Sequence, residues 1–443
     1  MLKTTRRRFL KQCSMVAGLS LMPSFGWAGD AGNEELDKPY SGWREGEMDI
    51  HFINTGLGES AFLIFPDSTS MVIDAGDSGN GNDSIEKFPD RSRRPGDWIA
   101  RYIQRVNPNG DQVDYFLISH FHGDHMGLPE WNTGKVGEGK EQYTLTGINY
   151  LGEVLHFKKG LDRGFPDYNK PAPYTSTQDR GDVVDNYRKF TEWKSKTDNL
   201  QMLPFQVGVS DQIILEKNRA KYPSFHTQNL YSGGIMWTGQ GTETIDLSDR
   251  IVKDNVGCRP PENSLSIALG ISYGPFRYFT AGDFNGHYTD ENGVEHFMEE
   301  ALARICGRAD VSKANHHCWR DTMTESLLRS LQSRVYLANT WDAAHVAPEA
   351  VQRIANHDFF PGERLVCPTM VPSNFKNLYS TDERYKSIVA QEAIEGGHVV
   401  VKVFDSGKQY KVYYLSPKDE NMTVRAVYGP YESRSNTDEI ASV

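Results

Sequence analysis

The sequence predicts an α/β fold of the sandwich type within one large domain over residues 48–443. Strand-like and helix-like patterns intermix along the chain without the regular strand–helix–strand period of a doubly wound parallel sheet. No internal repeat and no low-complexity tract interrupts this mixture. With 38% hydrophobic and 24% charged residues, the composition is that of an ordinary globular protein with a substantial core.

The first part of the domain combines short strands with one amphipathic helix. Residues 48–54, 60–65 and 71–73 are β-type runs separated by turns rich in Gly and Asp. Apolar residues recur at helical spacing over 95–106. Residues 113–119 form a near-continuous apolar run, as expected of a strand that is buried on both faces.

The middle of the chain is less regular, and strand-like patterning resumes after it. Residues 126–255 carry many aromatic residues, prolines and glycines, which predict an insertion or a set of long loops over a site. Within them, 171–177 resembles a loop and 185–195 a polar helix. Further strands are expected at 264–271, 277–281, 311–314, 335–338, 398–404 and 410–415, and helices at 295–306 and 322–330.

Residues 1–28 have the features of an export signal, followed by a polar linker over 29–47. Arg6 and Arg7 begin a basic segment, a short apolar stretch follows, and small residues end it as a signal peptidase requires. The paired arginines resemble a twin-arginine signal, which implies the twin-arginine export machinery as a partner and a periplasmic or extracellular location. No later stretch approaches the roughly 20 apolar residues of a membrane span, so we expect no stable membrane insertion after cleavage.

Charge and cysteine content narrow the partners. The chain carries a net charge of −11, and loss of the five basic residues in 1–28 would leave −16. Because such a surface repels polyanions, nucleic acid is an unlikely substrate. Cys258, Cys306, Cys318 and Cys367 remain after cleavage, and in an exported protein they could form two disulfides or stay as buried thiols.

Four candidate metal ligands lie within six residues, directly after the apolar run 113–119. These are His120, His122, Asp124 and His125, with Gly123 allowing a tight turn between the two pairs. In locally extended backbone, side chains two apart point the same way, so His120 and His122 can bind one metal while the other pair faces a second position. Imidazole and carboxylate donors without thiolate suit Zn, Fe or Mn with an open coordination position.

The motifs around this cluster resemble those of metallo-β-lactamase-fold hydrolases, in the branch related to the soluble domain of bacterial competence proteins. Besides the histidine cluster, five segments carry the resemblance, in family order. They are Asn54-Thr55-Gly56-Leu57-Gly58-Glu59-Ser60, Ile73-Asp74-Ala75-Gly76, Asn263-Ser264-Leu265-Ser266 with Phe279-Thr280-Ala281-Gly282-Asp283, and Lys313-Ala314-Asn315-His316-His317. The resemblance implies a four-layer αββα sandwich.

The resemblance also implies a ligand set for two divalent metal ions, with zinc expected and iron or manganese as alternatives. It places His120 and His122 on one metal and Asp124 and His125 on the other. Asp283 would bridge them, His317 would complete the second metal, and Asp74 would support the ligand loop from behind. Many relatives supply a further histidine between the first motif and the bridging aspartate, and here His156, Asp162, His226 or no residue could take that place. The two adjacent histidines, His316 and His317, are followed by Cys318 and Trp319, where most relatives have Gly and Ser.

This set predicts a hydrolase in which a metal-activated hydroxide attacks a phosphodiester or related ester. Asp124 could accept a hydrogen bond from the nucleophile, and His316 or His345 could protonate the leaving group. The substrate could be a small molecule or a polymer. Because true metallo-β-lactamases have a different ligand where Asp283 stands, β-lactam hydrolysis is not expected. The alternatives are a lactonase or thioesterase, an iron-dependent oxidoreductase on the same scaffold, and a nuclease.

Overall fold

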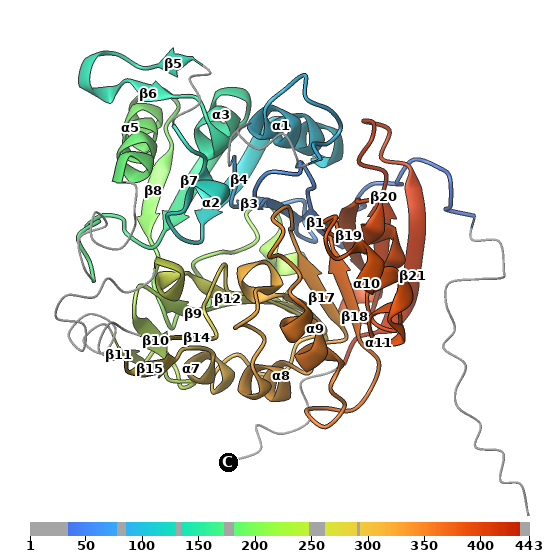
Figure 1. The fold of residues 1–443 in the computed structure, drawn as a ribbon. Coiled ribbons are helices and arrows are strands. Elements are labelled where there is room, and N and C mark those ends of the chain that lie inside the picture. Colours follow the sequence, from blue (N-terminus) through green and yellow to red (C-terminus); the bar gives the residue numbers. More distant parts are fainter. Residues whose placement is uncertain are drawn as a thin grey trace, which may run out of the picture.

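Two large β-sheets pack face to face in the computed structural model (Figure 1). The structure describes residues 34–77, 86–129, 134–171, 181–247, 262–289 and 293–434. The predicted signal at 1–28 and Cys258 lie outside these ranges. Within them, Cys306, Cys318 and Cys367 are buried free thiols, so the disulfide alternative does not apply to these three. No helix in the described ranges is long and apolar enough to cross a membrane.

The first sheet has nine strands in the order β21-β20-β19-β1-β2-β3-β4-β7-β8. Its strands are β1 (Met48–Phe52), β2 (Ala61–Ile64), β3 (Ser70–Ile73), β4 (Gln112–Ile118), β7 (His156–Asp162), β8 (Gln201–Pro204), β19 (His398–Phe404), β20 (Gln409–Leu415) and β21 (Val424–Glu432). From β3 to β8 the neighbouring strands are parallel, and the others pair antiparallel. Two small hairpins complete the strands outside the two large sheets: β5 (Lys135–Val136) with β6 (Tyr143–Thr144), and β14 (His287–Thr289) with β15 (Glu295–Phe297).

The second sheet has eight strands in the order β11-β10-β9-β12-β13-β16-β17-β18. Its strands are β9 (Phe225–Ser232), β10 (Ile235–Trp237), β11 (Thr244–Asp246), β12 (Ala268–Tyr273), β13 (Phe276–Thr280), β16 (Val311–Lys313), β17 (Val335–Ala338) and β18 (Leu365–Pro368). The strands β13, β16, β17 and β18 run parallel. Both sheets therefore contain a parallel part whose strands end at a common edge.

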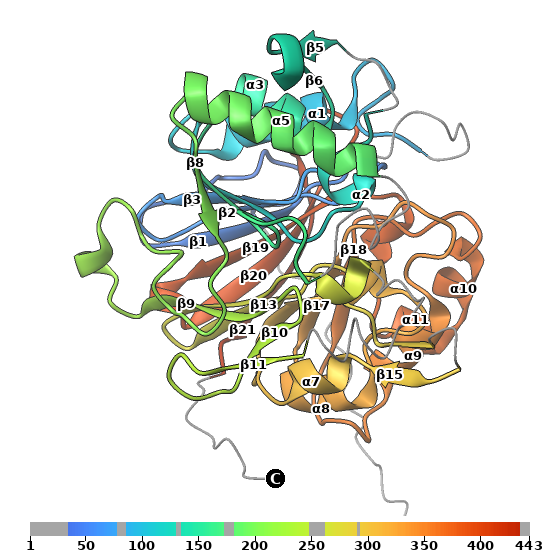
Figure 2. The same cartoon turned by 90° about the vertical axis from the view of Figure 1, so that its left-hand side faces the viewer.

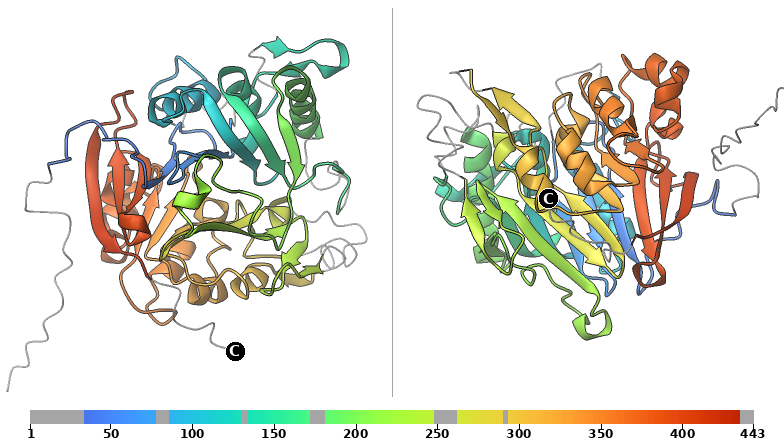
Figure 3. Two further views of the ribbon diagram at one scale, coloured as in Figure 1. Left: turned by 180° about the vertical axis from the view of Figure 1, so that it is seen from behind. Right: turned by 90° about the horizontal axis from the view of Figure 1, so that it is seen from below.

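Helices cover the outer face of each sheet, as Figure 2 shows from the side and Figure 3 from behind and below. The first sheet carries α1 (Pro95–Val106), α3 (Gly147–Val154) and α5 (Gly181–Thr197), and the second carries α7 (Glu299–Ala303), α8 (Glu325–Leu331) and α9 (Pro348–Ala355). Shorter helices are α2 (Gly123–Met126), α10 (Lys376–Thr381) and α11 (Glu383–Lys386), with 3-10 turns at Gly139–Glu141, Arg219–Lys221, Glu262–Leu265, Asn315–Cys318, Gln391–Ile394 and Asp405–Gly407. The architecture is the predicted αββα sandwich.

Burial on both faces explains the apolar run that precedes the histidine cluster. In β4, Tyr115 and Leu117 belong to the core between the two sheets, whereas Phe116 and Ile118 pack under the helices. Because both faces of the strand are covered, positions 115–118 are all apolar and the alternation of a half-exposed strand is lost. The chain then leaves the sheet at Ile118 and enters the ligand loop.

The structure differs from the sequence predictions in three elements. Residues 126–255, expected as an insertion, supply β7 and β8 to the first sheet and β9, β10 and β11 to the second, so much of this segment is part of the sandwich. The predicted strand 264–271 begins as a 3-10 turn and becomes β12 only at Ala268. The predicted helix 295–306 is wrong in its first turn, because Glu295–Phe297 form β15 and the helix is limited to Glu299–Ala303. In the last case, the residues of the expected first helical turn pair instead with the neighbouring strand β14.

Candidate metal centre

The predicted ligands converge where the carboxyl ends of parallel strands in the two sheets meet. His120 and His122 follow β4, Asp124 and His125 lie in α2, and Asp74 follows β3. From the second sheet, Asp283 follows β13, and His316 and His317 follow β16. Parallel strands end at the same edge of a sheet, so residues as far apart in the chain as Asp74 and His317 reach one place.

Close backbone contact holds the ligand loop against the turn after β3. A Cβ atom on Gly76 would lie 1.7 Å from the carbonyl oxygen of Asp124, which only glycine avoids. The amide of Ala75 donates to the carbonyl of His125, and the amide of Glu59 donates to that of Asp124, both at 2.8 Å. The loop that carries the ligands is thus fixed by main-chain hydrogen bonds.

One carboxylate oxygen, Oδ2 of Asp283, lies at the centre of the cluster. It is 2.9 Å from Nε2 of His317 and 3.0 Å from Nε2 of His125. It is also 4.0 Å from Nε2 of His120 and 4.0 Å from Nε2 of His316. A single oxygen therefore lies close to imidazoles from two segments: the ligand loop (His120–His125) and the double-histidine turn (Asn315–Cys318).

The remaining donors form two groups around that oxygen. On one side, Nε2 of His120 lies 3.0 Å from Nδ1 of His122. On the other, Oδ2 of Asp124 lies 3.9 Å from Nε2 of His125 and 3.6 Å from Nε2 of His317. Those two imidazole nitrogens are themselves 3.3 Å apart. Several ring nitrogens aimed at one another at such distances fit a site that is built around cations.

The buried carboxyl of Asp74 orients one of these ligands. It accepts from the amide of Ser119 at 2.7 Å, from the hydroxyl of Ser119 at 2.6 Å, and pairs with Nδ1 of His125 at 2.8 Å. When Nδ1 of His125 donates to Asp74, Nε2 keeps its lone pair for a metal. The carbonyl of Asn339 lies 3.1 Å from Nδ1 of His317 and acts on that ring in the same way.

A buried lysine and glutamate complete the centre, and the sequence analysis did not assign them a role. Nζ of Lys313 lies 3.3 Å from Oδ1 of Asp283, 3.2 Å from Oε2 of Glu59 and 2.6 Å from the carbonyl of Gly282. Glu59, His125, Asp283 and His317 can place ligand atoms within 4.8 Å of one another. Both residues belong to segments that carry the family resemblance, which was the available signal.

The pKa values of Asp283 and His317 are shifted because buried carboxylates in the cluster need positive charge beside them. Burial opposes ionisation of Asp283, but His125, His317 and Lys313 outweigh it and hold the pKa of this carboxyl well below its usual range. Burial likewise opposes protonation of His317, yet Asp283 and Asp124 raise its pKa to about 10. Without metal the protons on His125 and His317 thus balance the carboxylates, and a divalent ion can replace them.

The domain around this centre matches a known family in sequence. Residues 54–130 match the model of the Metallo-beta-lactamase superfamily, a range that contains Glu59, Asp74 and the four ligands from His120 to His125. A search among curated proteins finds no match.

Three solved structures resemble the chain remotely. A variant of the CmlA β-hydroxylase is 11% identical over 66% of this chain and 45% of that one, with a TM-score of 0.33, so this chain spans less than half its length. The metallo-β-lactamase fold protein YhfI from Bacillus subtilis is 10% identical over 72% and 96% (TM-score 0.36). Zn²⁺-bound PqqB from Methylobacterium extorquens is 11% identical over 78% and 97% (TM-score 0.33). Likeness at this level says nothing about substrate.

The sequence left His156, Asp162 and His226 open as a further metal ligand. None of the three is placed to donate to a metal in the cluster. His156 is exposed and pairs with Gln112 at the start of β4, about 20 Å from the end that reaches the ligands. His226 pairs with Ser272 in β12, at the far end of the second sheet. Asp162 is buried, but Oδ1 accepts from two backbone amides and Oδ2 from the hydroxyls of two tyrosines, Tyr168 and Tyr187.

Replacing Asp162 by asparagine is expected to lower stability and leave metal content unchanged. Its carboxylate accepts four hydrogen bonds in the core, and asparagine can accept from only one of its two side-chain atoms. We expect a loss of about 1–3 kcal/mol in the free energy of unfolding, measured by urea denaturation. Loss of a metal ion from this variant, measured by elemental analysis, would instead identify Asp162 as a ligand.

His345 lies beside the cluster, behind His317. Its ring centroid is 4.6 Å from that of His317 and 4.6 Å from that of Trp341. Nδ1 accepts from the amides of Trp341 and Asp342 at 3.4 and 3.3 Å, so Nε2 carries the hydrogen. Burial and the neighbouring His317 hold the pKa of His345 well below its usual range, which keeps the ring neutral.

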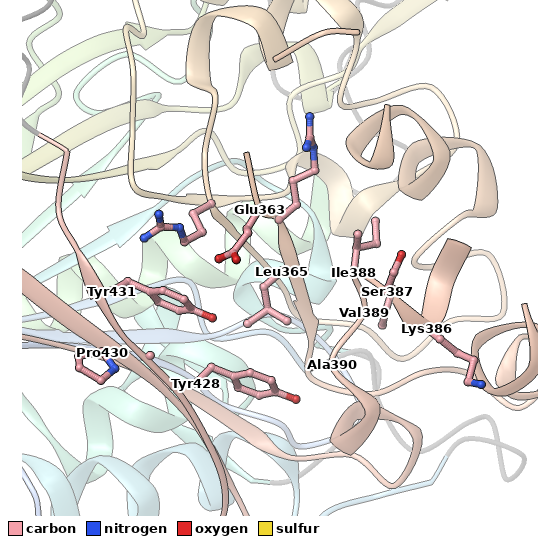
Figure 4. Close-up of a pocket in the computed structure, with 13 residues that line it drawn as sticks. Glu363, Leu365, Lys386, Ser387, Ile388, Val389, Ala390, Tyr428, Pro430 and Tyr431 are labelled. Carbon is pink, nitrogen blue, oxygen red and sulfur yellow. The ribbon is translucent and has the colours of Figure 1, made fainter. Parts of the chain in front are cut away.

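A separate cavity lies at the edge of the sandwich. Its volume is about 370 Å³, and Figure 4 shows Tyr428 and Tyr431 extending from β21 toward Leu365 of β18. None of the predicted site residues lines it. The metal centre and this cavity are therefore distinct features of the molecule.

Proposed function

We propose that this chain is an exported, dinuclear-metal hydrolase that cleaves a phosphodiester or related ester, in the competence-protein-like branch of the superfamily. The observation that carries the proposal is the position of Asp283. One of its oxygens lies within 4.0 Å of imidazole nitrogens from both the ligand loop and the double-histidine turn. That is the arrangement expected of a carboxylate shared by two cations.

The donors fit two divalent ions, with zinc proposed and iron or manganese possible. The predicted ligands are neutral imidazoles and carboxylates with no thiolate among them, which suits metals that act as Lewis acids. His120 and His122 would hold the first ion, Asp124, His125 and His317 the second, and Asp283 both. When bound, such a pair lowers the pKa of a shared water and polarises the substrate oxygen.

Residues around the two metal positions would orient the attacking water, stabilise the leaving group and hold the ligand rings in place. Asp124 is the most exposed of the carboxylates in the cluster, with 28% of its side chain accessible, so it can accept a hydrogen bond from an attacking water while it ligates. His345 is neutral with its hydrogen on Nε2, so it can donate a hydrogen bond that stabilises negative charge on a departing oxygen. Asp74 and Asn339 hold the ligand rings in orientation and touch no substrate.

Charge and the N-terminal signal favour a small or weakly charged substrate outside the cytoplasm. A mature chain with a net charge of −16 would repel nucleic acid. The twin-arginine route exports folded proteins, which suits an enzyme that acquires its metals before export.

Replacing Arg6 and Arg7 together by lysine is expected to hold the precursor in the cytoplasm. Cell fractionation measures this, and normal export of the variant would contradict it.

The function is tested on mature protein purified in folded form, by elemental analysis and a substrate panel. The panel contains bis(p-nitrophenyl) phosphate, a lactone, a thioester and a β-lactam. We expect two metal ions per chain and hydrolysis of the phosphodiester that is lost in Asp124→Ala. Iron without hydrolysis of any compound would favour an oxidoreductase, and hydrolysis of the lactone or thioester alone would change the substrate class.

A further inference from the structure

We propose that His316 is the ligand that completes the first metal, in the place that many relatives fill from between the first motif and the bridging aspartate. The inference rests on the proposed dinuclear function and assigns a different role to His316 from the proton donor expected from the sequence. The first metal would then have His120, His122, His316 and Asp283. The second would have Asp124, His125, His317 and the same Asp283.

The chain offers no other histidine for that place. Between His125 and Asp283 the whole sequence contains only His156 and His226. Both pair with strand residues at the ends of the sheets that are remote from the cluster. Without a further donor, the first metal would have only two imidazoles and one shared carboxylate oxygen. Zinc in protein sites takes four ligands, with water filling the last position in catalytic ones.

His316 lies where that donor is needed. Its Nε2 is 4.0 Å from Oδ2 of Asp283, the same distance as Nε2 of His120. The side-chain amide nitrogen of Asn263 lies 3.2 Å from Nε2 of His316 and donates to it. With the amide donating, Nε2 carries the lone pair of the ring, and a bound metal would take this lone pair in place of the amide hydrogen.

The backbone of the double-histidine turn explains why two adjacent rings face one carboxylate. In extended backbone, neighbouring side chains point to opposite sides. Here His316, His317 and Cys318 all have left-handed backbone, with φ of 47°, 53° and 62°. This conformation is unfavourable for residues with a Cβ atom and is found where surrounding structure enforces it, often at functional sites. The turn brings Nε2 of both histidines within 4.0 Å of the same oxygen.

Apart from Asn263, the contacts that hold the ring of His316 in place do not involve Nε2. The ring stacks on Trp319, with centroids 5.2 Å apart and an interplanar angle of 16°. The backbone amide of His316 donates to the carbonyl of Gly282, next to Asp283. Nδ1 is buried and has no hydrogen-bond partner. A proton donor to a departing group would need an exchange route through this ring, whereas a ligand needs only Nε2.

The test compares His316→Gly with His345→Ala by metal content and by Co²⁺ titration of the apo protein. Glycine suits the left-handed φ of this position, so the variant is expected to fold, and circular dichroism checks this. We expect His316→Gly to retain one metal ion per chain and to lose more than about 100-fold in affinity for the other, beyond the 10–100-fold cost of a residue outside the coordination shell. His345→Ala is expected to retain both.

The outcomes separate this inference from the proposed function. If His316→Gly keeps two ions with wild-type affinity and loses only turnover, His316 is the proton donor and the inference fails. If the wild type binds one ion and the variant none, the dinuclear function fails while the ligand role stands. If the wild type and the variant bind the same single ion equally, both fail. Restoration of the second Co²⁺ by added imidazole would support ligation directly.

Discussion

Replacing Asp283 by alanine is expected to release both metal ions and to lower phosphodiester hydrolysis at least about 1000-fold. Its Oδ2 lies within 4.0 Å of donors from both metal groups. Alanine would leave the ligands of each metal one donor short. The two cations would also repel each other without a shared carboxylate between them. Elemental analysis and steady-state kinetics on the same preparation measure both effects.

Asp310 provides a matched control for this substitution. It is as buried as Asp283, with 1% of each residue exposed, and it precedes β16 at the end of that strand away from the metal centre. Its carboxyl accepts from the amides of Arg277 and Arg434. Asp310→Ala is expected to lower stability and to keep both metals. An Asp283→Ala enzyme that retained two ions would refute the bridge, whatever its activity.

Replacing Lys313 by methionine is expected to lower the free energy of unfolding of the metal-free protein by about 3–5 kcal/mol. Nζ of Lys313 lies between Glu59 and Asp283, and all three residues are buried. Removal of the ammonium leaves two carboxylates in the interior without their shared counter-charge. Bound metal ions supply positive charge at Asp283, so the loss should be smaller in metal-saturated protein. Urea denaturation with a chelator and with zinc measures the difference.

Lys402 offers the same chemistry away from the metal centre. Its Nζ lies 2.6 Å from Glu47 and 3.3 Å from Asp49, and its side chain is 7% exposed. Lys402→Met should destabilise the protein to a comparable extent, but zinc should not restore it. If zinc leaves the Lys313→Met deficit unchanged, or restores both variants equally, the link between Lys313 and the metal-bridging carboxylate is wrong.

Much of the sandwich could be predicted because the decisive signals are local. Residues 113–119 form a near-continuous apolar run, and the structure shows why in β4, which is covered on both faces. The helix at 95–106 begins and ends where its apolar spacing indicated. Strands β7 and β9 were missed, since their sequences mix charged and polar residues and they are stabilised by neighbours from elsewhere in the chain.

By itself the sequence determined the ligand loop and the family of motifs around it. Spacing within His120–His125 is a local property, because six residues that follow a buried strand can bring their side chains together without help from distant segments. The export signal at 1–28 stays a prediction from local sequence, because the described residues do not include it.

Only the tertiary structure decided which residues from the second sheet reach that loop, and in what orientation. Glu59 and Lys313 are ordinary polar residues in sequence, and they become a buried pair because strands 250 residues apart end at one edge. Asp162 is a carboxylate that could ligate a metal, but both of its oxygens accept hydrogen bonds in the core. Both rings of the double histidine face Asp283 because three successive residues adopt left-handed backbone, a conformation that surrounding contacts must enforce and that no spacing rule reveals.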